Sequence, residues 1–131
     1  MATLRAVIEA ARFMGFIPVS HLAKARSFYS DVLGLRVREE NPFAVSLDSG
    51  DTTIRLTQVE DLQPQNFTIA GWVVPDLHVA IDALVGRGVT FTRYGGMNQD
   101  ERGIWTTPNG DQVAWFKDPD GNTLSLTTFA E

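Results

Sequence analysis

The chain has 131 residues, no cysteine and a formal net charge of −5 at neutral pH. Its length fits one domain or two small modules, and its 44% share of apolar residues is enough for a packed core. The lack of cysteine excludes disulfides, thiolate metal sites and thiol nucleophiles, and the acidic balance argues against nucleic acid as a partner. We expect no membrane span and a cytoplasmic protein, because no run approaches about 20 apolar residues and residues 1–12 lack a signal-peptide pattern.

The first part of the chain predicts a helical start, a strand and then a helix. Helical spacing at the start indicates a short amphipathic helix, with a frayed terminus as the alternative, from Leu4, Val7, Ile8 and Ala11. Residues 13–19 predict a strand near a sheet edge, because Pro18 lacks the N–H group that a central strand needs. The next helix begins after Ser20 or His21 and ends at Gly34. Its apolar stripe comprises Leu22, Ala25, Phe28, Tyr29 and Val32.

Three short strands then complete a first βαβββ module, at residues 35–38, 44–47 and 53–59. Residues 60–66 have linker composition, so module one covers about residues 13–60 and module two about residues 67–131. The second module begins with a strand at residues 68–74 and a helix that Asp76 caps and that Gly86 and Gly88 end. Its remaining strands are predicted at residues 89–93, at 104–106 or 112–116, and at 123–128.

A tight turn at residues 118–122, with the sequence DPDGN, separates the last two predicted strands. Pro119 presets φ, the Asp118 side chain can accept hydrogen bonds from nearby backbone, and Gly121 can take positive φ. A fainter copy of this turn begins at Asp48. The two copies indicate an internal repeat.

The two modules differ by an insertion in the second. Matching residues are 55 positions apart from Val19 to Val74 but 70 positions apart from Leu56 to Leu126, so module two carries about fifteen extra residues. They fall at residues 94–109, and a loop of this length is more often functional than idle. The alternative is a decorative hairpin at the edge of a dimer.

Two stretches carry a family resemblance: residues 28–35, with the sequence FYSDVLGL, and the DPDGN turn. They resemble the first-helix and last-turn signatures of the vicinal oxygen chelate superfamily, which includes glyoxalase I, extradiol dioxygenases and bleomycin-resistance proteins. The likeness covers about residues 13–129 and implies that residues 1–131 form a single such domain. It also implies an α+β fold in which two βαβββ modules with curled mixed sheets form a concave cleft, with the helices outside.

In metal-dependent members of that superfamily, four strand positions supply His, Glu or Gln ligands. The resemblance places Met14, Arg55, Ile69 and Ser125 at these positions. None is a usual ligand of a divalent ion, and a guanidinium would put a fixed positive charge where the cation binds. We therefore expect a branch that lacks the metal ligands, with no metal and no cofactor. His21 and His78 are expected to be solvated residues of the first helical turns.

Strand alternation and the insertion predict the residues of a small-molecule site. One side of the strands carries Met14, Phe16, Arg55, Ile69 and Ser125, while Ile17, Ile54, Trp72, Leu124 and Leu126 face the helices. The predicted walls are Trp105 and Trp115, with Tyr94 and Met97 from the insertion, although an aromatic residue on a strand is core about as often as it lines a pocket.

Two main functional hypotheses follow, together with a third that we rank below them. The first is a metal-independent binding protein of the bleomycin-resistance type that sequesters a small aromatic or amphipathic molecule; the second is a metal-free lyase, isomerase or hydrolase. Catalytic candidates for the second are Arg55, Glu101 and Tyr94. The third is a divalent-metal glyoxalase or dioxygenase. A homodimer is expected, because curled sheets expose edges and apolar faces.

Overall fold

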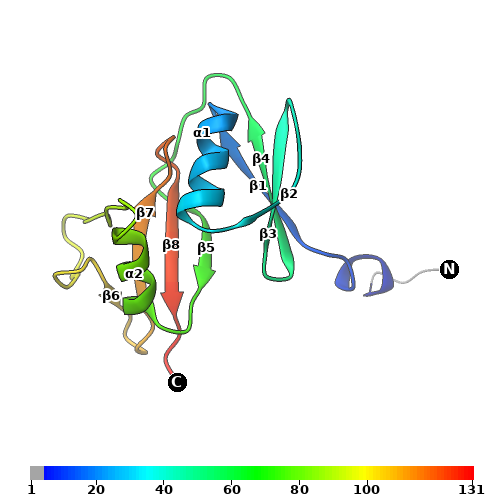
Figure 1. Ribbon diagram of the computed structural model, residues 1–131. Coiled ribbons are helices and arrows are strands. Elements are labelled where there is room, and N and C mark those ends of the chain that lie inside the picture. Colours follow the sequence, from blue (N-terminus) through cyan, green and yellow to red (C-terminus); the bar gives the residue numbers. More distant parts are fainter. Residues whose placement is uncertain (1–4) are drawn as a thin grey trace. The chain divides into compact units, whose positions relative to one another are not determined.

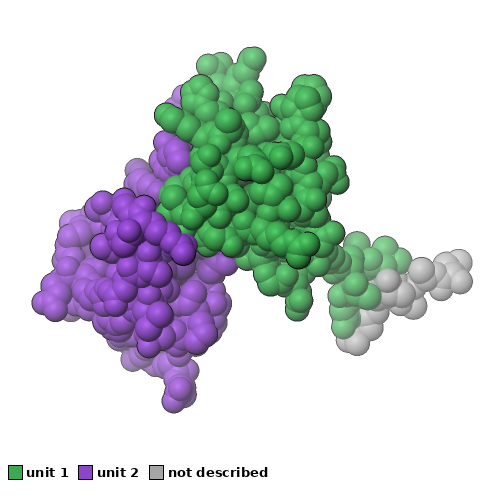
Figure 2. Space-filling model, viewed as in Figure 1, with its two compact units in different colours: residues 1–62 green, residues 63–131 purple. Residues whose placement is uncertain are grey.

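The computed structural model describes residues 5–131. The chain forms two compact units, with the boundary between Leu62 and Gln63 (Figure 2). This boundary lies inside the segment 60–66 that was predicted as a linker. Each unit contains one α-helix and one four-stranded mixed sheet, which confirms the α+β class and the two βαβββ modules. No helix in residues 5–131 is long and apolar enough to cross a membrane.

The sheet of unit 1 has the strand order β1-β4-β3-β2, in which β1 runs parallel to β4 and the other pairs are antiparallel (Figure 1). The helix α1 lies against β3 and β4 and continues into a π-helical turn, η2. The elements are η1 (Arg5–Glu9), β1 (Met14–Val19), α1 (Leu22–Ser27), η2 (Phe28–Val32), β2 (Arg36–Asn41), β3 (Ala44–Ser49) and β4 (Thr52–Gln58). The predicted N-terminal helix is thus a short π-helical turn, and Leu4 lies outside the described residues.

The core of unit 1 follows strand alternation. Ile17 and Leu56 are register partners in β1 and β4, and both are buried. On the opposite side of β1, Met14 and Phe16 remain exposed. The alternation of buried and exposed residues along β1 is therefore the one that its sequence predicts.

The two helices begin differently. Asp76 caps the second helix as predicted, since its side chain accepts hydrogen bonds from the backbone N–H groups of His78 and Val79. His21 makes no such side-chain bond. Instead, the backbone N–H of Leu22 donates to Oε1 of Gln58 at 3.2 Å. A residue at the end of β4 thus accepts a hydrogen bond from one of the backbone N–H groups that are left without a partner at the start of α1.

Unit 2 repeats this plan with the strand order β5-β8-β7-β6, in which β5 is parallel to β8 (Figure 1). The helix α2 lies against β7 and β8, and its buried residues are Leu77, Ile81 and Leu84. The elements are β5 (Thr68–Val73), α2 (Leu77–Val85), β6 (Trp105–Thr106), β7 (Gln112–Lys117) and β8 (Thr123–Thr128).

One strand prediction was wrong. Residues 89–93 do not form a strand, and only Phe91 makes an isolated bridge, to Phe116 in β7. Further along, Trp105 and Thr106 pair with Val113 and Gln112 as β6. The segment that pairs with the outer edge of β7 is therefore split into two pieces, Phe91 and β6. Both alternatives predicted for the middle strand, residues 104–106 and 112–116, are strands. The insertion occupies the gap between the pieces.

The DPDGN turn forms the predicted link between β7 and β8. Oδ1 of Asp118 accepts hydrogen bonds of 2.9 Å from the backbone N–H groups of Asp120 and Asn122. Gly121 adopts φ 89°, a left-handed conformation that favours glycine. Asp118 and Asn122 are also buried, so the turn is an internal support of unit 2.

Candidate functional site

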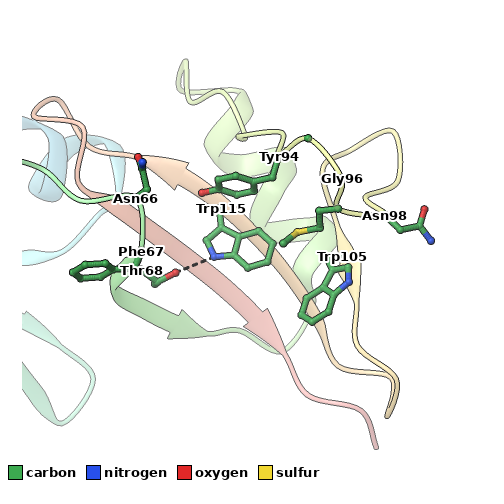
Figure 3. A pocket seen from close by; sticks show the side chains of 10 residues that line it. Asn66, Phe67, Thr68, Tyr94, Gly96, Asn98, Trp105 and Trp115 are labelled. Atoms are coloured by element: carbon green, nitrogen blue, oxygen red, sulfur yellow. Dashed lines mark hydrogen bonds between the residues drawn. The ribbon is translucent and has the colours of Figure 1, made fainter.

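Unit 2 contains a pocket of about 810 Å³ at the face of its sheet. Its walls come from the start of β5, from the insertion and from two tryptophans on β6 and β7 (Figure 3). The lining residues are Asn66, Phe67, Thr68, Tyr94, Gly95, Gly96, Met97, Asn98, Trp105 and Trp115. None of these ten residues is Lys, Arg, His, Asp or Glu, so the lining is aromatic and uncharged.

The two tryptophans lie side by side because of the sheet register. Trp105 pairs with Val113, and Trp115 follows two residues later on the same face of β7, so the indoles are diagonal neighbours. Their ring centroids are 6.3 Å apart with an interplanar angle of 31°. A ring inserted between two faces needs roughly 7–8 Å, twice the usual carbon–carbon contact distance. The pair therefore offers a shared platform and not a slot.

Trp115 is held in place from two directions. Its Nε1–H donates to Oγ1 of Thr68 at 3.0 Å, a bond that joins β7 to β5 (Figure 3). The ring of Tyr94 meets Trp115 edge to face, with centroids 5.5 Å apart and an interplanar angle of 87°. This geometry is a favoured one for aromatic pairs. The indole thus has a fixed orientation at the floor of the pocket.

Four of the predicted ligand-binding residues are brought together here, namely Tyr94, Met97, Trp105 and Trp115. The other lining residues were missed. Gly95, Gly96 and Asn98 belong to the insertion, whose length was the signal that could have found them. Phe67 and Thr68 lie where the linker meets β5, and nothing in their local sequence distinguishes them from ordinary strand residues.

The remaining predicted ligand-binding residues do not line this pocket. Met14, Phe16 and Arg55 lie on β1 and β4 of unit 1, where Nη1 of Arg55 donates to Oγ of Ser46 at 3.4 Å. Ile69 and Ser125 lie in unit 2. Ser125 is the register partner of Trp115, so it shares the platform's face of the sheet.

The three catalytic candidates are not gathered at one cavity. Tyr94 lines the aromatic pocket, whereas Glu101 lines a separate cavity of about 410 Å³ beside Ile81 and Val85 of α2. Arg55 belongs to unit 1.

The carboxylates of Asp100 and Asp111 have local roles. Oδ1 of Asp100 accepts hydrogen bonds from the backbone N–H groups of Arg102 and Ile104, both at 2.9 Å. Oδ1 of Asp111 accepts one from Ala130 at 2.8 Å.

The residues at the four family metal positions do not fit a divalent cation. They present a thioether, a guanidinium, an aliphatic chain and a hydroxyl, at Met14, Arg55, Ile69 and Ser125. Within residues 5–131, no three His, Cys, Asp or Glu side chains come together in a way that could hold a metal.

Solved structures resemble this chain over most of its length. A glyoxalase/bleomycin resistance protein/dioxygenase superfamily member from Sphaerobacter thermophilus is 27% identical, with TM-score 0.70 and coverage of 92% of this chain and 98% of that one. A glyoxalase/bleomycin resistance protein/dioxygenase from Alicyclobacillus acidocaldarius is 18% identical, with TM-score 0.73 and 93% coverage of both chains. A lactoylglutathione lyase from Agrobacterium tumefaciens is 17% identical, with TM-score 0.68 and coverage of 91% and 93%.

Among curated proteins there is no significant match. The family model of the glyoxalase/bleomycin resistance protein/dioxygenase superfamily matches residues 9–126. That span includes both βαβββ modules and the DPDGN turn, which carried the resemblance at the level of sequence. The chain belongs to the glyoxalase/bleomycin resistance protein/dioxygenase superfamily.

Proposed function

We propose that this protein binds a small aromatic or amphipathic molecule in the aromatic pocket of unit 2, without a metal ion. The observation that carries the proposal is the platform of Trp105 and Trp115, with Tyr94 beside it. Small-molecule sites are typically concave and apolar, with a few polar groups that fix orientation. The pocket volume of about 810 Å³ lies within the range of such sites.

The lining also indicates the chemistry of the ligand. A planar ring can lie across the two indoles, where burial of its face contributes about 25 cal/mol per Å² and aromatic contact adds about 0.5–1.5 kcal/mol. The Tyr94 hydroxyl, the Asn66 amide and the backbone of Gly95 and Gly96 can hydrogen-bond to polar groups at its rim. Because no lining side chain is charged, the part of the ligand in the pocket is expected to be neutral.

Sequestration is favoured over catalysis by the composition of the site. General acid–base chemistry needs titratable groups within hydrogen-bond reach of the reacting atoms. Tyr94 is the one titratable side chain among the ten lining residues, and Glu101 lines the other cavity. Stoichiometric binding, as in a resistance protein of the bleomycin type, needs affinity alone.

A calorimetric titration tests the proposal. Neutral aromatic probes such as indole and 2-naphthol should bind the wild-type protein with a measurable heat and raise its melting temperature. Trp115→Ala and Trp105→Ala should each weaken binding by at least about tenfold, since burying an aromatic side chain is worth more than 1.4 kcal/mol. Trp72→Phe is the matched control, because Trp72 does not line the pocket.

Two other outcomes would count against the proposed function. Equal affinity in the wild type and in both platform variants, with all chains folded by circular dichroism, would show that the pocket is not the binding site. Turnover of a substrate that depends on Arg55 or Glu101 would favour the enzyme hypothesis instead.

A further inference from the structure

The insertion forms one wall of the pocket, and the tip of this wall, at Gly95 and Gly96, has no side-chain packing. The chain leaves the sheet after the bridge at Phe91 and returns at Trp105. At the tip, a Cβ added to Gly95 or Gly96 would meet no atom within 4 Å. No side chain at these two positions fixes the tip, and hydrogen bonds within the loop help to hold it.

One side chain makes three of the hydrogen bonds within the loop. Nε2 of Gln99 donates to the carbonyl oxygen of Thr92 at 3.0 Å and to that of Gly103 at 2.8 Å. Oε1 of the same amide accepts a hydrogen bond of 2.7 Å from the backbone N–H of Tyr94. Both amide protons and the amide oxygen of Gln99 are thus used within the loop. It ties the two ends of the loop together.

The backbone of Gln99 is connected to the platform as well. Gln99 forms an isolated antiparallel bridge with Trp105, the first residue of β6. Through its side chain it fixes Tyr94, and through its backbone it is fixed to Trp105. Gln99 is therefore bonded to Tyr94 and bridged to Trp105, the two residues that flank Trp115 in the pocket.

We propose that Gln99 is a positioning residue for ligand binding, which sets the shape of the aromatic pocket by fixing Tyr94 against Trp115. Gln99 does not line the pocket, and both amide protons and the amide oxygen already form hydrogen bonds within the loop. The expected effect of Gln99 on ligand affinity rests on the proposed binding function. Its effect on the loop can be measured without any ligand.

Two substitutions separate the contributions of the amide. Gln99→Leu removes all three hydrogen bonds at nearly constant size. Gln99→Glu retains the acceptor for the Tyr94 N–H but places a carboxylate against the carbonyl groups of Thr92 and Gly103. Gln63→Leu is the matched control, because Gln63 lies outside the loop and the lining.

Binding of 2-naphthol, followed by calorimetric titration, gives the first readout. Gln99→Leu should weaken binding by about tenfold or more, because the hydrogen bonds that fix Tyr94 are lost, while Gln63→Leu leaves it unchanged. Gln99→Glu should recover affinity as the pH falls below about 4.3, where the acid takes up a proton and can donate again. A residue with only a structural role would not show this recovery.

Hydrogen exchange of the Tyr94 amide gives the second readout and needs no ligand. Exchange should be at least about tenfold faster in Gln99→Leu than in the wild type, because the N–H loses its acceptor. If 2-naphthol does not bind the wild type, the proposed function fails, and the exchange rate still decides the role of Gln99. If affinity and Tyr94 exchange are both unchanged in Gln99→Leu, the inference is overturned.

Discussion

The platform of the pocket depends on single residues that orient an indole, and Thr68 is the clearest of them. Its hydroxyl accepts the Nε1–H of Trp115 across the intervening strand β8. We expect Thr68→Val to leave the fold intact but to weaken binding of a neutral aromatic probe by about 0.5–1.5 kcal/mol, the usual net worth of one hydrogen bond. Calorimetric titration measures the change, with Thr106→Val, outside the pocket, as the control. Equal affinity in both variants would show that the bond does not orient Trp115.

The four residues at the family metal positions lead to a second expectation. Met14, Arg55, Ile69 and Ser125 supply no donor set that suits a divalent ion. We expect elemental analysis after mild purification to find no stoichiometric zinc, nickel, iron or manganese, and EDTA to leave probe binding unchanged. One equivalent of bound metal that is lost together with probe affinity would contradict this.

Asp48 couples the stability of unit 1 to pH. It accepts hydrogen bonds from Nε of Arg38 at 2.6 Å and from Nη2 of Arg12 at 3.1 Å. The bond from Arg38 is the main cause that lowers the pKa of Asp48 below its ordinary value. A lowered folded-state pKa contributes stability that is complete above the ordinary value, about 3.9, and is lost as the pH falls from there through the folded-state pKa.

We therefore expect Asp48→Asn to lower the urea midpoint at neutral pH, and the difference from the wild type to shrink below about pH 4. Asp51→Asn, in the exposed turn that follows, serves as the control. A midpoint difference that stays constant down to about pH 2 would mean that the ionised carboxylate is not the stabilising form.

At the scale of elements, the register between β5 and β8 constrains one glycine. Gly71 pairs with Ser125, and a Cβ at Gly71 would overlap Oγ of Ser125 and lie 3.1 Å from its carbonyl oxygen. We expect Gly71→Ala to destabilise the protein by about 1–3 kcal/mol through overpacking. Urea unfolding measures this, and Gly95→Ala is the control, because its Cβ meets no neighbouring atom.

The same clash can be partly relieved. Ser125→Ala in the Gly71→Ala background removes the hydroxyl but leaves the carbonyl oxygen, so part of the lost stability should return. Strictly additive effects of the two substitutions would show that Ser125 Oγ is not the atom in conflict.

Most elements were predictable because local chemistry decides them. Gly34 with φ 77° ends the first helical segment, Asp76 caps α2, and the DPDGN turn closes the last hairpin, all through bonds within a few residues. The strand predicted at residues 89–93 does not form, because a side chain from outside this segment competes for backbone groups at its end. The carbonyl of Thr92 and the N–H of Tyr94 bond to the side chain of Gln99, so these two groups do not extend the pairing with β7. Alternating polar and apolar residues cannot reveal such a competitor.

The residues that line the candidate pocket were also predictable only in part. Tyr94, Met97, Trp105 and Trp115 were predicted as lining residues because large apolar side chains in a long insertion, or on the strand that follows it, are conspicuous in a sequence. Thr68 and Gln99 were missed, because an ordinary polar residue gains its role from partners 47 and 5 positions away, Trp115 and Tyr94. The placement of Met14, Phe16 and Arg55 at a binding site stays a prediction.

At the scale of the whole molecule, the exposed aromatic residues bear on assembly. Phe16, Phe43 and Phe67 are 61%, 77% and 64% exposed, high values for side chains of this size. We propose that part of this surface is covered in a homodimer and expect sedimentation equilibrium to show twice the chain mass of 14.5 kDa. A monomer at every accessible concentration would contradict the proposal.

The split edge strand of unit 2 has a consequence for how new binding properties can arise. Since β6 contributes only Trp105 and Thr106 to the ladder, the segment between Phe91 and Trp105 can vary in length or sequence at little cost to the sheet, provided that Gln99 and its bridge to Trp105 remain. Inherited variation in this segment, or a library of grafted loops, would then reshape one wall while the tryptophan floor persists. Unit 1 has no equivalent freedom, because its edge strand β2 pairs with β3 over most of its length.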